Sequence, residues 1–261
     1  MDLFLRRLIC SLIARYIKVD FYGYNLNAIL FGTKLCSARC LCSENFHAAL
    51  GEEMPDIRYL ALGDSYTIGE SVPENERWPN QLAGLLQAND VSTEVTIIAR
   101  TGWTTDELWK GIQAREINPP YDLVSLLIGV NNQYRGGDID KYREEFIFLL
   151  NKAIDYAGGD AKRVIVLSIP DWGATPFAMS HDSKKIATKI NLFNSVNREE
   201  TEKAGAHYVD VTPSSRKAIT DGALIAADGL HPSGKMYAEW AKLAHPEVLK
   251  MLEDLIRLQK G

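Results

Sequence analysis

The sequence predicts an α/β fold in which a parallel sheet of five strands lies between two layers of helices. From residue 57 onward, short apolar runs alternate with longer stretches whose apolar residues recur at helical spacing. A glycine lies at or near the end of each of the first three apolar runs, where a sharp turn is needed. The chain has 261 residues, of which 46% are hydrophobic, and this is enough to bury one full core.

The elements follow in order along the chain. The expected strands are Ile57 to Leu62, Glu94 to Ala99, Leu123 to Ile128, Val164 to Ile169 and His207 to Val211. Two core-facing helices are indicated by the stripes Ile139, Tyr142, Phe146, Leu149, Ala153, Ile154 and Ile186, Ile190, Phe193, Val196. Pro79 fits the first turn of another helix, and Pro246 is expected to split the C-terminal helical region in two. Together these elements predict a flavodoxin-like three-layer αβα sandwich with strand order 2-1-3-4-5.

A sheet of this kind binds ligands at the carboxyl ends of its strands, beside the first strand. The segment Gly63-Asp64-Ser65-Tyr66 directly follows that strand. A serine just past a buried strand, preceded by a glycine that permits a sharp turn, is how α/β folds expose a nucleophile. Gly, Asp and Ser are also ordinary turn and cap residues, so this segment alone does not establish one. Asp64 is assigned to hydrogen bonding within the turn.

Near the other end of the chain, Asp228-Gly229-Leu230-His231-Pro232 places an acid three residues before a histidine. At this spacing the carboxylate can reach the imidazole Nδ1–H, fix the tautomer and leave Nε2 free to accept a proton from a serine. Taken separately, each residue is better explained without catalysis, Asp228 as a turn former and His231 as a capping or surface residue.

Two further segments end at the same predicted edge of the sheet. The second strand runs into Thr101-Gly102-Trp103, and the third into Gly129-Val130-Asn131-Asn132. A glycine N–H and an asparagine amide delivered beside Ser65 could donate hydrogen bonds to a developing oxyanion. Their simpler interpretations are a glycine at a helix entry and an asparagine in a turn.

With these four segments in this order, the sequence resembles the SGNH or GDSL family of esterases, acylhydrolases and lipase-like enzymes from about Ile57 to about Leu243. The family's Ser, Gly, Asn and His would be Ser65, Gly102, Asn131 and His231, with Asp228 completing the catalytic triad. Tyr66 stands where the family often has leucine, and Asn132 where it often has aspartate. Neither departure touches a group that performs chemistry, so they bear on the substrate and not on the mechanism.

The resemblance implies an SGNH hydrolase fold and a serine esterase that works through an acyl-enzyme intermediate, without cofactor or metal. The N–H groups of Ser65 and Gly102 and the amide of Asn131 would form the oxyanion hole. Candidates for the walls of the substrate pocket are Tyr66, Trp103, Tyr134 and Trp172, for which plain packing is an equal alternative. His207, which begins the fifth strand, is assigned a structural role.

Three other functions stay open from the residues. The same groups could remove acetyl groups from a carbohydrate. A catalytically inactive binding module on this fold would not need all five residues of the set. A metal hydrolase could use Asp64, Asp228 and His231.

Charge and composition limit the partners. The formal net charge is −5 and there is no lysine or arginine run, which argues against binding to nucleic acid or to an anionic membrane. No stretch approaches the ~20 apolar residues that spanning a bilayer requires. The expected partner is a small-molecule ester, and the sequence does not indicate an oligomeric state.

Residues 1–53 are expected to be an N-terminal extension outside a hydrolase domain that covers 54–261. All four cysteines lie in it, and Cys36, Cys40 and Cys42 do not have zinc-finger spacing. Arg15, Lys18 and Asp20 interrupt the apolar run that a secretory signal needs. A cytoplasmic location is favoured, with export as the alternative if the extension is a degenerate signal, and Met54 is a candidate for the true start.

Overall fold

The computed structural model describes the backbone of residues 57–260 and the side chains of residues 57–253. The expected extension over 1–53, with its cysteines and candidate export signal, lies outside the described residues. Among the described helices, none is both long enough and apolar enough to cross a membrane.

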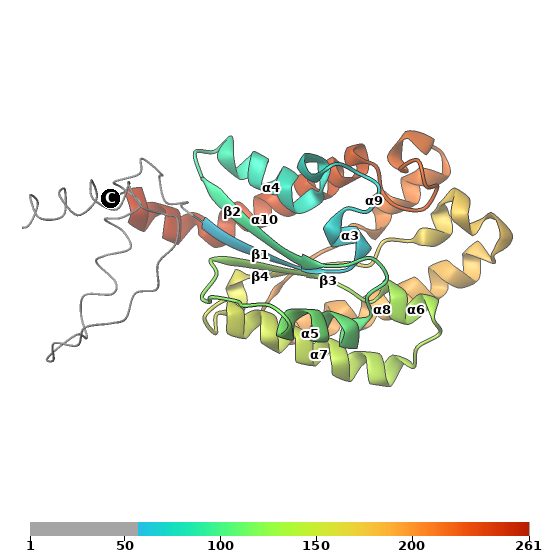
Figure 1. Ribbon diagram of the computed structural model, residues 1–261, viewed down its shortest axis with the longest axis horizontal. Helices are drawn as coiled ribbons and strands as arrows, with labels where there is room; N and C mark the ends of the chain where they lie inside the picture. Colours follow the sequence, from blue (N-terminus) through green and yellow to red (C-terminus); the bar gives the residue numbers. More distant parts are fainter. Residues whose placement is uncertain (1–56, 261) are drawn as a thin grey trace, which may run out of the picture. The chain divides into compact units, whose positions relative to one another are not determined.

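The core of the described region is one parallel sheet of five strands in the order β2-β1-β3-β4-β5 (Figure 1). The strands are β1 Ile57–Gly63, β2 Thr93–Ala99, β3 Leu123–Leu127, β4 Val164–Leu167 and β5 His207–Val209. This confirms the predicted fold class and strand order. The three central strands are apolar and almost wholly buried, as expected for a sheet covered on both faces, whereas the edge strand β2 is half-buried.

The register places the ends of the first three strands level with one another. Gly63, the last residue of β1, pairs with Ala99 of β2 and with Leu127 of β3. The segments that follow these strands therefore leave the sheet at the same edge. This register brings the motifs around residues 65, 102 and 131 to one place.

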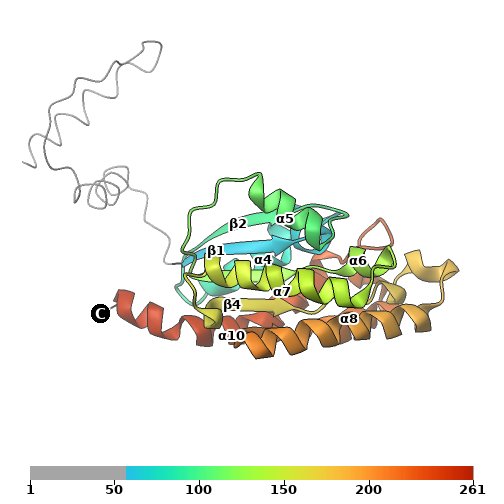
Figure 2. The same cartoon turned by 90° about the horizontal axis from the view of Figure 1, so that it is seen from below.

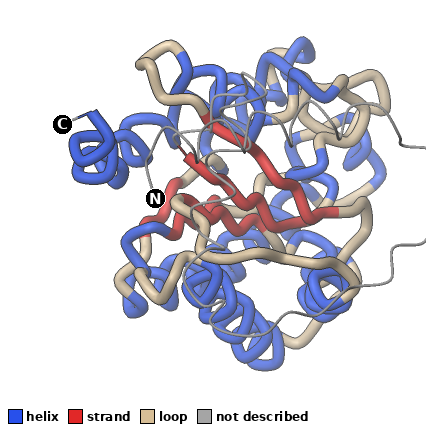
Figure 3. Tube along the Cα trace, turned by 60° about the vertical axis from the view of Figure 1, so that its left-hand side comes forward, coloured by secondary structure: helices blue, strands red, loops and turns tan. Residues whose placement is uncertain are grey.

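Helices cover both faces of the sheet, and Figure 3 shows the strands between them. In Figure 1, α4 (Trp78–Gln87) and α10 (Gly234–Lys260) lie above the sheet. Figure 2 shows the opposite face, with α5 (Thr105–Gln113), α7 (Ile139–Tyr156) and α8 (Ser183–Ala204) in front. The apolar stripes predicted for α7 and α8 lie in the core, with Tyr142, Phe146, Ile190 and Phe193 buried.

The expected break at Pro246 was wrong, because α10 continues through this residue. Proline removes one backbone hydrogen bond and crowds the preceding turn. The buried side chains Trp240, Ala244, Val248 and Leu252 lie on both sides of Pro246, so one continuous apolar face packs on the domain. Pro246 itself is exposed. The free energy gained by burying that face offsets the loss of one backbone hydrogen bond on the solvent side of the helix.

The last two strands are shorter than their apolar runs. Past β4, both backbone groups of Ile169 bond to the side chain of Asn194, at 2.8 and 2.9 Å, instead of to a neighbouring strand. Past β5, the N–H of Val211 donates to Ser168 Oγ at 2.8 Å. Side chains therefore bond the backbone groups that a neighbouring strand would otherwise bond, and each strand ends before its apolar run does.

Short helices begin where three of the strands end. They are α3 (Ser65–Ile68) after β1, α6 (Val130–Tyr134) after β3 and α9 (Thr212–Arg216) after β5. Short 3₁₀ turns fill the remaining loops at Glu74–Glu76, Ala161–Arg163, Trp172–Ala174, Pro176–Ser180, Lys217–Ile219 and Gly222–Leu224.

Candidate active site

Ser65 is the first residue of α3, directly after the turn that ends β1. The turn requires Gly63, because a Cβ there would lie 2.1 Å from Thr67 Oγ1 and 2.5 Å from the carbonyl oxygen of Leu127. Ser65 is only 4% exposed, which is less than a serine in a turn would be expected to be. In the part of the chain that the structure describes, its Oγ and its backbone N–H make no hydrogen bond. Both groups are free for an incoming substrate.

Asp64 caps the helix that Ser65 begins. Its Oδ1 accepts the N–H of Tyr66 at 3.0 Å, as expected for a turn residue. The side chain is fully buried, and Oδ2 has no hydrogen-bond partner among the described residues. Burial therefore raises the pKa of Asp64 to about 7, against the opposing effect of the Tyr66 N–H.

Asp228 and His231 form the hydrogen-bonded pair that their spacing predicted. Oδ2 of Asp228 lies 2.6 Å from Nδ1 of His231, and Oδ1 accepts the N–H groups of Leu230 and His231, each at 2.9 Å. An Nδ1 proton shared with a carboxylate leaves Nε2 as the basic nitrogen of a neutral imidazole. His231 is 8% exposed. Partial burial alone would raise the pKa of Asp228, but hydrogen bonds from Ser71, the Leu230 N–H and His231 hold it well below its usual range.

The Asp228–His231 pair packs against the segment that carries Ser65. The ring of Tyr66 meets the ring of His231 edge-on, with centroids 5.8 Å apart. Ser71, in the loop that follows α3, donates its hydroxyl to Asp228 Oδ2 at 2.7 Å, although 157 residues separate the two in sequence. The fold thus brings the two ends of the predicted constellation together.

Gly102 and Asn131 lie next to each other at the same edge. Nδ2 of Asn131 donates to the carbonyl of Trp103 at 3.0 Å and keeps its second N–H free. Gly102 has φ of +88°, a conformation that favours glycine, and its N–H makes no hydrogen bond within residues 57–260. The described residues therefore present three unused donors at this edge, from Ser65, Gly102 and Asn131.

Arg135, which the sequence analysis did not single out, fixes the Gly102 loop. Its Nη2 donates to the carbonyl of Gly102 at 2.6 Å, and its Nη1 lies 3.2 Å from Oε2 of Glu107. The signal was available, because Arg135 follows Asn131 by four residues and so shares its helix face. Asn132 holds α5 instead, because its Oδ1 accepts the N–H of Thr105 at 3.1 Å and its Nδ2 donates to Thr105 Oγ1 at 2.8 Å.

The four candidates for a substrate pocket lie in different environments. Tyr66 is 3% exposed and packs against His231 and Trp240, so it offers little surface to a substrate. Trp103 is half-buried and packs on Gly111 of α5. Tyr134 is 52% exposed and meets the buried ring of Trp172 edge-on at 5.3 Å. Of the four, Tyr134 is the most exposed, and it lines a groove together with Trp172.

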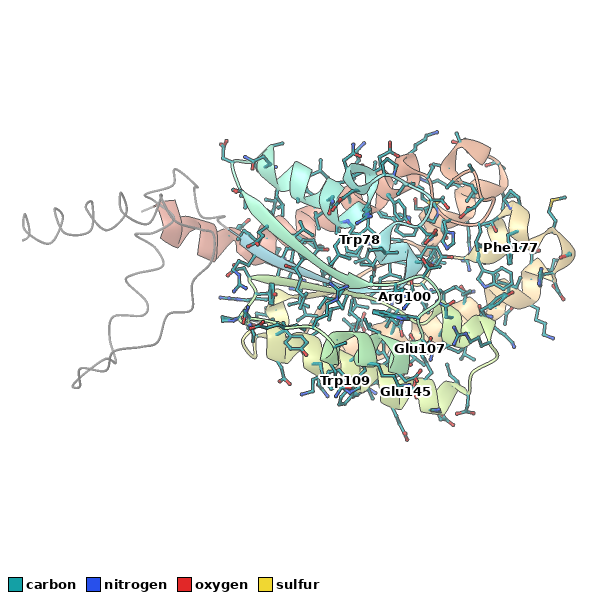
Figure 4. All side chains as sticks on the ribbon, in the orientation of Figure 1. Trp78, Arg100, Glu107, Trp109, Glu145 and Phe177 are labelled. Atoms are coloured by element: carbon teal, nitrogen blue, oxygen red, sulfur yellow. The ribbon has the colours of Figure 1, made fainter. Side chains whose placement is uncertain are left out.

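Phe177 and His181, which the sequence analysis missed, extend the pair into an aromatic cluster. The ring of His181 lies 5.3 Å from that of Trp172 and 6.0 Å from that of Phe177. Figure 4 shows Phe177 at the end of the described region toward which the strands point. Its backbone N–H donates to the carbonyl of Gly229 at 2.9 Å, which ties the cluster to the turn between Asp228 and His231.

A groove of about 440 Å³ runs beside this cluster, lined by Gln133, Tyr134, Gly136, Trp172, His181, Asp182, Lys185, Ile186 and Lys189. Among the side chains of residues 57–253, no group of three or more His, Cys, Asp or Glu residues is placed to hold a metal ion. Asp64, Asp228 and His231 accordingly do not form such a group, and their contacts are those given above. Nδ1 of His207, the first residue of β5, lies 3.5 Å from Oε2 of Glu247 of α10.

Solved structures share this fold. TesA superposes with a TM-score of 0.60 at 17% identity, over 75% of this chain and 99% of that one. A variant of Axe2, an acetyl xylan esterase from Geobacillus stearothermophilus, gives 0.56 at 19% identity, over 74% and 94%. EstA, an esterase from Pseudoalteromonas sp. inhibited by monoethylphosphonate in its structure, gives 0.52 at 18% identity, over 77% and 97%. At such identities the likeness shows a common fold.

A search of curated proteins found no match. The family model of the GDSL-like lipase/acylhydrolases, in contrast, matches residues 61–239, which include every segment of the candidate site. This match covers more than half of the chain and confirms the resemblance that the sequence motifs carried. The chain belongs to the GDSL-like lipase/acylhydrolase family.

Proposed function

We propose that this protein hydrolyses carboxylic esters through an acyl-enzyme intermediate formed on Ser65. The observation that carries the proposal is the 2.6 Å contact between Asp228 and His231, packed against the segment in which Ser65 begins a helix. A carboxylate-bound imidazole beside a serine with a free hydroxyl is the arrangement that activates a weak oxygen nucleophile.

In the first half of the reaction, Ser65 Oγ attacks the ester carbonyl while its proton passes to Nε2 of His231. The carbon–oxygen bond to the alcohol then breaks, and the same proton leaves with the alcohol. In the second half, water attacks the acyl-enzyme and gives its proton to His231, which returns it to Ser65 Oγ as the acid departs. Asp228 orients the imidazole and stabilises its charged form throughout.

The oxyanion of each tetrahedral intermediate is assigned to the N–H groups of Ser65 and Gly102 and the amide of Asn131. The two N–H groups have no partner among the described residues, and Asn131 keeps one N–H unused. Donors that are already unpaired need no reorganisation as the charge develops, and one such donor is worth roughly 10²- to 10³-fold in rate.

The test is covalent labelling with an alkyl phosphonate, located by peptide mass spectrometry. We expect one phosphonate per chain on Ser65 and no labelling of Ser65→Ala, whose kcat should fall to the residual level set by binding and the oxyanion hole. Ser183→Ala is the matched control, because Ser183 also begins a helix directly after a capping aspartate. A Ser65→Ala variant that keeps more than about a tenth of kcat would exclude Ser65 as the nucleophile.

A second candidate is the removal of acetyl groups from a carbohydrate by the same residues. The groove beside Tyr134 and Trp172 supports it, because aromatic faces accept the apolar faces of sugar rings while Gln133 and Lys185 can bond hydroxyl groups. Hydrolysis of simple esters of graded acyl length, measured beside an acetylated xylo-oligosaccharide, distinguishes the two. Preference for the sugar with activity restricted to acetyl favours deacetylation, and activity that rises with acyl length favours a general esterase.

A further inference from the structure

Ser71 has a backbone conformation that serine rarely adopts. Its φ is +66°, and among residues 57–260 the only other non-glycine with positive φ is Asp90. In this region the Cβ of an L-residue is crowded, so a side chain there costs free energy that glycine would avoid. Ser71 is exposed, and its side chain does not pack in the core. The conformation is therefore associated with what its hydroxyl does.

The hydroxyl of Ser71 binds the same carboxylate oxygen as His231. Oδ2 of Asp228 accepts from Ser71 Oγ at 2.7 Å and lies 2.6 Å from Nδ1 of His231, while Oδ1 is held by two backbone N–H groups of its own loop. Among the described residues, Ser71 is the only one outside the 228–231 turn that bonds this carboxylate.

The loop that carries Ser71 is fixed to the helix of Ser65. The N–H groups of Gly69 and Glu70 both donate to the carbonyl oxygen of Ser65, each at 3.0 Å. On the other side, the carboxylate of Glu70 accepts the hydroxyl of Thr101, the residue before Gly102. The loop 69–71 therefore bonds to the backbone of Ser65 at one end and to the carboxylate of Asp228 at the other.

We propose that Ser71 is a positioning residue that sets the place and charge of Asp228, and through it the imidazole of His231 relative to Ser65. The proposal rests on the hydrolytic function proposed above. The hydroxyl fixes Oδ2 in the direction of His231 and withdraws part of its negative charge. Without it, the carboxylate attracts the imidazolium proton more strongly, and His231 acts as a base only at higher pH.

Other titratable groups around the pair are the same in the wild type and the variants. They are Tyr66 of α3, Tyr237 of α10, Glu70 of the same loop and Asp64 at the helix cap, whose pKa of about 7 affects each pH profile alike. Burial raises the pKa values of Tyr66 and Tyr237 well above that of a free tyrosine, so both remain neutral across the working range.

The test separates the hydroxyl from the backbone conformation by measuring kcat/KM against pH and thermal stability for two variants. Ser71→Gly removes the hydroxyl and relieves the positive φ. We expect it to be at least as stable as the wild type, to lose roughly threefold to tenfold in kcat and to have its acidic limb moved to higher pH. Ser71→Thr keeps the hydroxyl on a side chain that fits positive φ poorly. We expect it to be less stable but to keep the pH profile.

Asp90→Gly is the control, because it relieves the other left-handed residue without touching the site, and it should keep kcat and the pH profile. A Ser71→Gly variant with wild-type kcat and an unmoved acidic limb would overturn the proposal, as would a loss of activity that follows stability in both variants. Ser65→Ala measured in parallel tests the hydrolytic function separately. The downfield proton resonance of the Asp228–His231 hydrogen bond gives a readout without turnover, and it should move in Ser71→Gly even when combined with Ser65→Ala.

Discussion

Nδ1 of His231 lies 2.6 Å from Oδ2 of Asp228, within a turn whose own N–H groups hold the other carboxylate oxygen. Residues 228–231 supply both partners and the two N–H groups that hold Oδ1. The rest of the fold adds the Ser71 hydroxyl, which donates to Oδ2, and the approach of Ser65.

Replacing the acid of this pair tests its role in orienting the base. In Asp228→Asn the imidazole loses its charge partner and can adopt the wrong tautomer, so kcat should fall on the order of 10²- to 10⁴-fold. The control is Asp221→Asn, since Asp221 also accepts a backbone N–H two residues on, in a neighbouring turn, but pairs with Lys235. If Asp228→Asn kept wild-type kcat, another acid would have to orient the histidine.

The wild-type activity should rise with pH, because only the neutral imidazole of His231 can accept the proton of Ser65. The pKa of Asp228 lies well below its ordinary value, so this carboxylate stays ionised throughout. Its contribution to folding stability is complete above the pKa of an unfolded aspartate and is lost only as pH falls toward the folded value. Activity should therefore decline in mild acid before the fold does, as kcat/KM and circular dichroism on the same samples would show.

Substitution of Asn131 should affect mainly catalysis, and substitution of the adjacent Asn132 mainly stability. Asn131→Ala removes a proposed oxyanion donor, so the transition state should lose roughly 3 kcal/mol of stabilisation. We expect kcat to fall accordingly, with little change in KM. Asn132→Ala removes two hydrogen bonds to the first residue of α5, so it should lower the free energy of unfolding by about 1–3 kcal/mol while leaving kcat largely intact. A large kcat effect confined to Asn132 would place the oxyanion donor one residue later.

Asp64→Asn should stabilise the protein at neutral and alkaline pH. With a folded pKa of about 7 against the ordinary value near ~3.9, the native state binds the proton more tightly, so wild-type stability falls as pH rises from ~4 to ~7. The amide keeps the bond from the Tyr66 N–H and carries no charge. We expect a gain of roughly 1–3 kcal/mol at pH 8 and little difference at pH 4, measured by denaturant unfolding.

The matched control for Asp64→Asn is Asp182→Asn, at the exposed cap of α8, which should give no such gain. Equal stability of Asp64→Asn and wild type at both pH values would mean that other groups already offset the cost of burying the carboxylate's charge.

Tyr134→Ala tests the groove. Loss of an exposed ring beside the proposed site should raise KM roughly threefold to tenfold for esters large enough to reach it, with kcat and acetate esters little affected. Phe148→Ala is the control, because Phe148 is also an exposed aromatic but packs on Trp109 between α7 and α5, on the helix layer seen at the bottom of Figure 4. An unchanged KM for every ester would show that the groove does not take part in substrate binding.

The sequence by itself determined the features that depend on neighbours along the chain. Apolar runs and helical stripes predicted five strands in their correct order, since a parallel sheet with crossover helices has few arrangements. The turn of Asp228 and His231 and the cap made by Asp64 also followed from spacing, because their hydrogen bonds span only two or three residues. Pro246 was misjudged because local propensity cannot register a buried helix face on both sides of a proline.

Tertiary structure alone decided the contacts between residues far apart in sequence. The bond from Ser71 to Asp228 joins residues 157 apart, and no pattern in an exposed loop predicts it. Burial of Asp64, and with it the raised pKa, depends on the loops that close over β1. The aromatic cluster forms because different segments of the chain bring Tyr134, Trp172 and Phe177 into contact at one end of the sheet. Such contacts depend on which segments the sheet register brings to the same edge, and spacing along one segment does not contain that information.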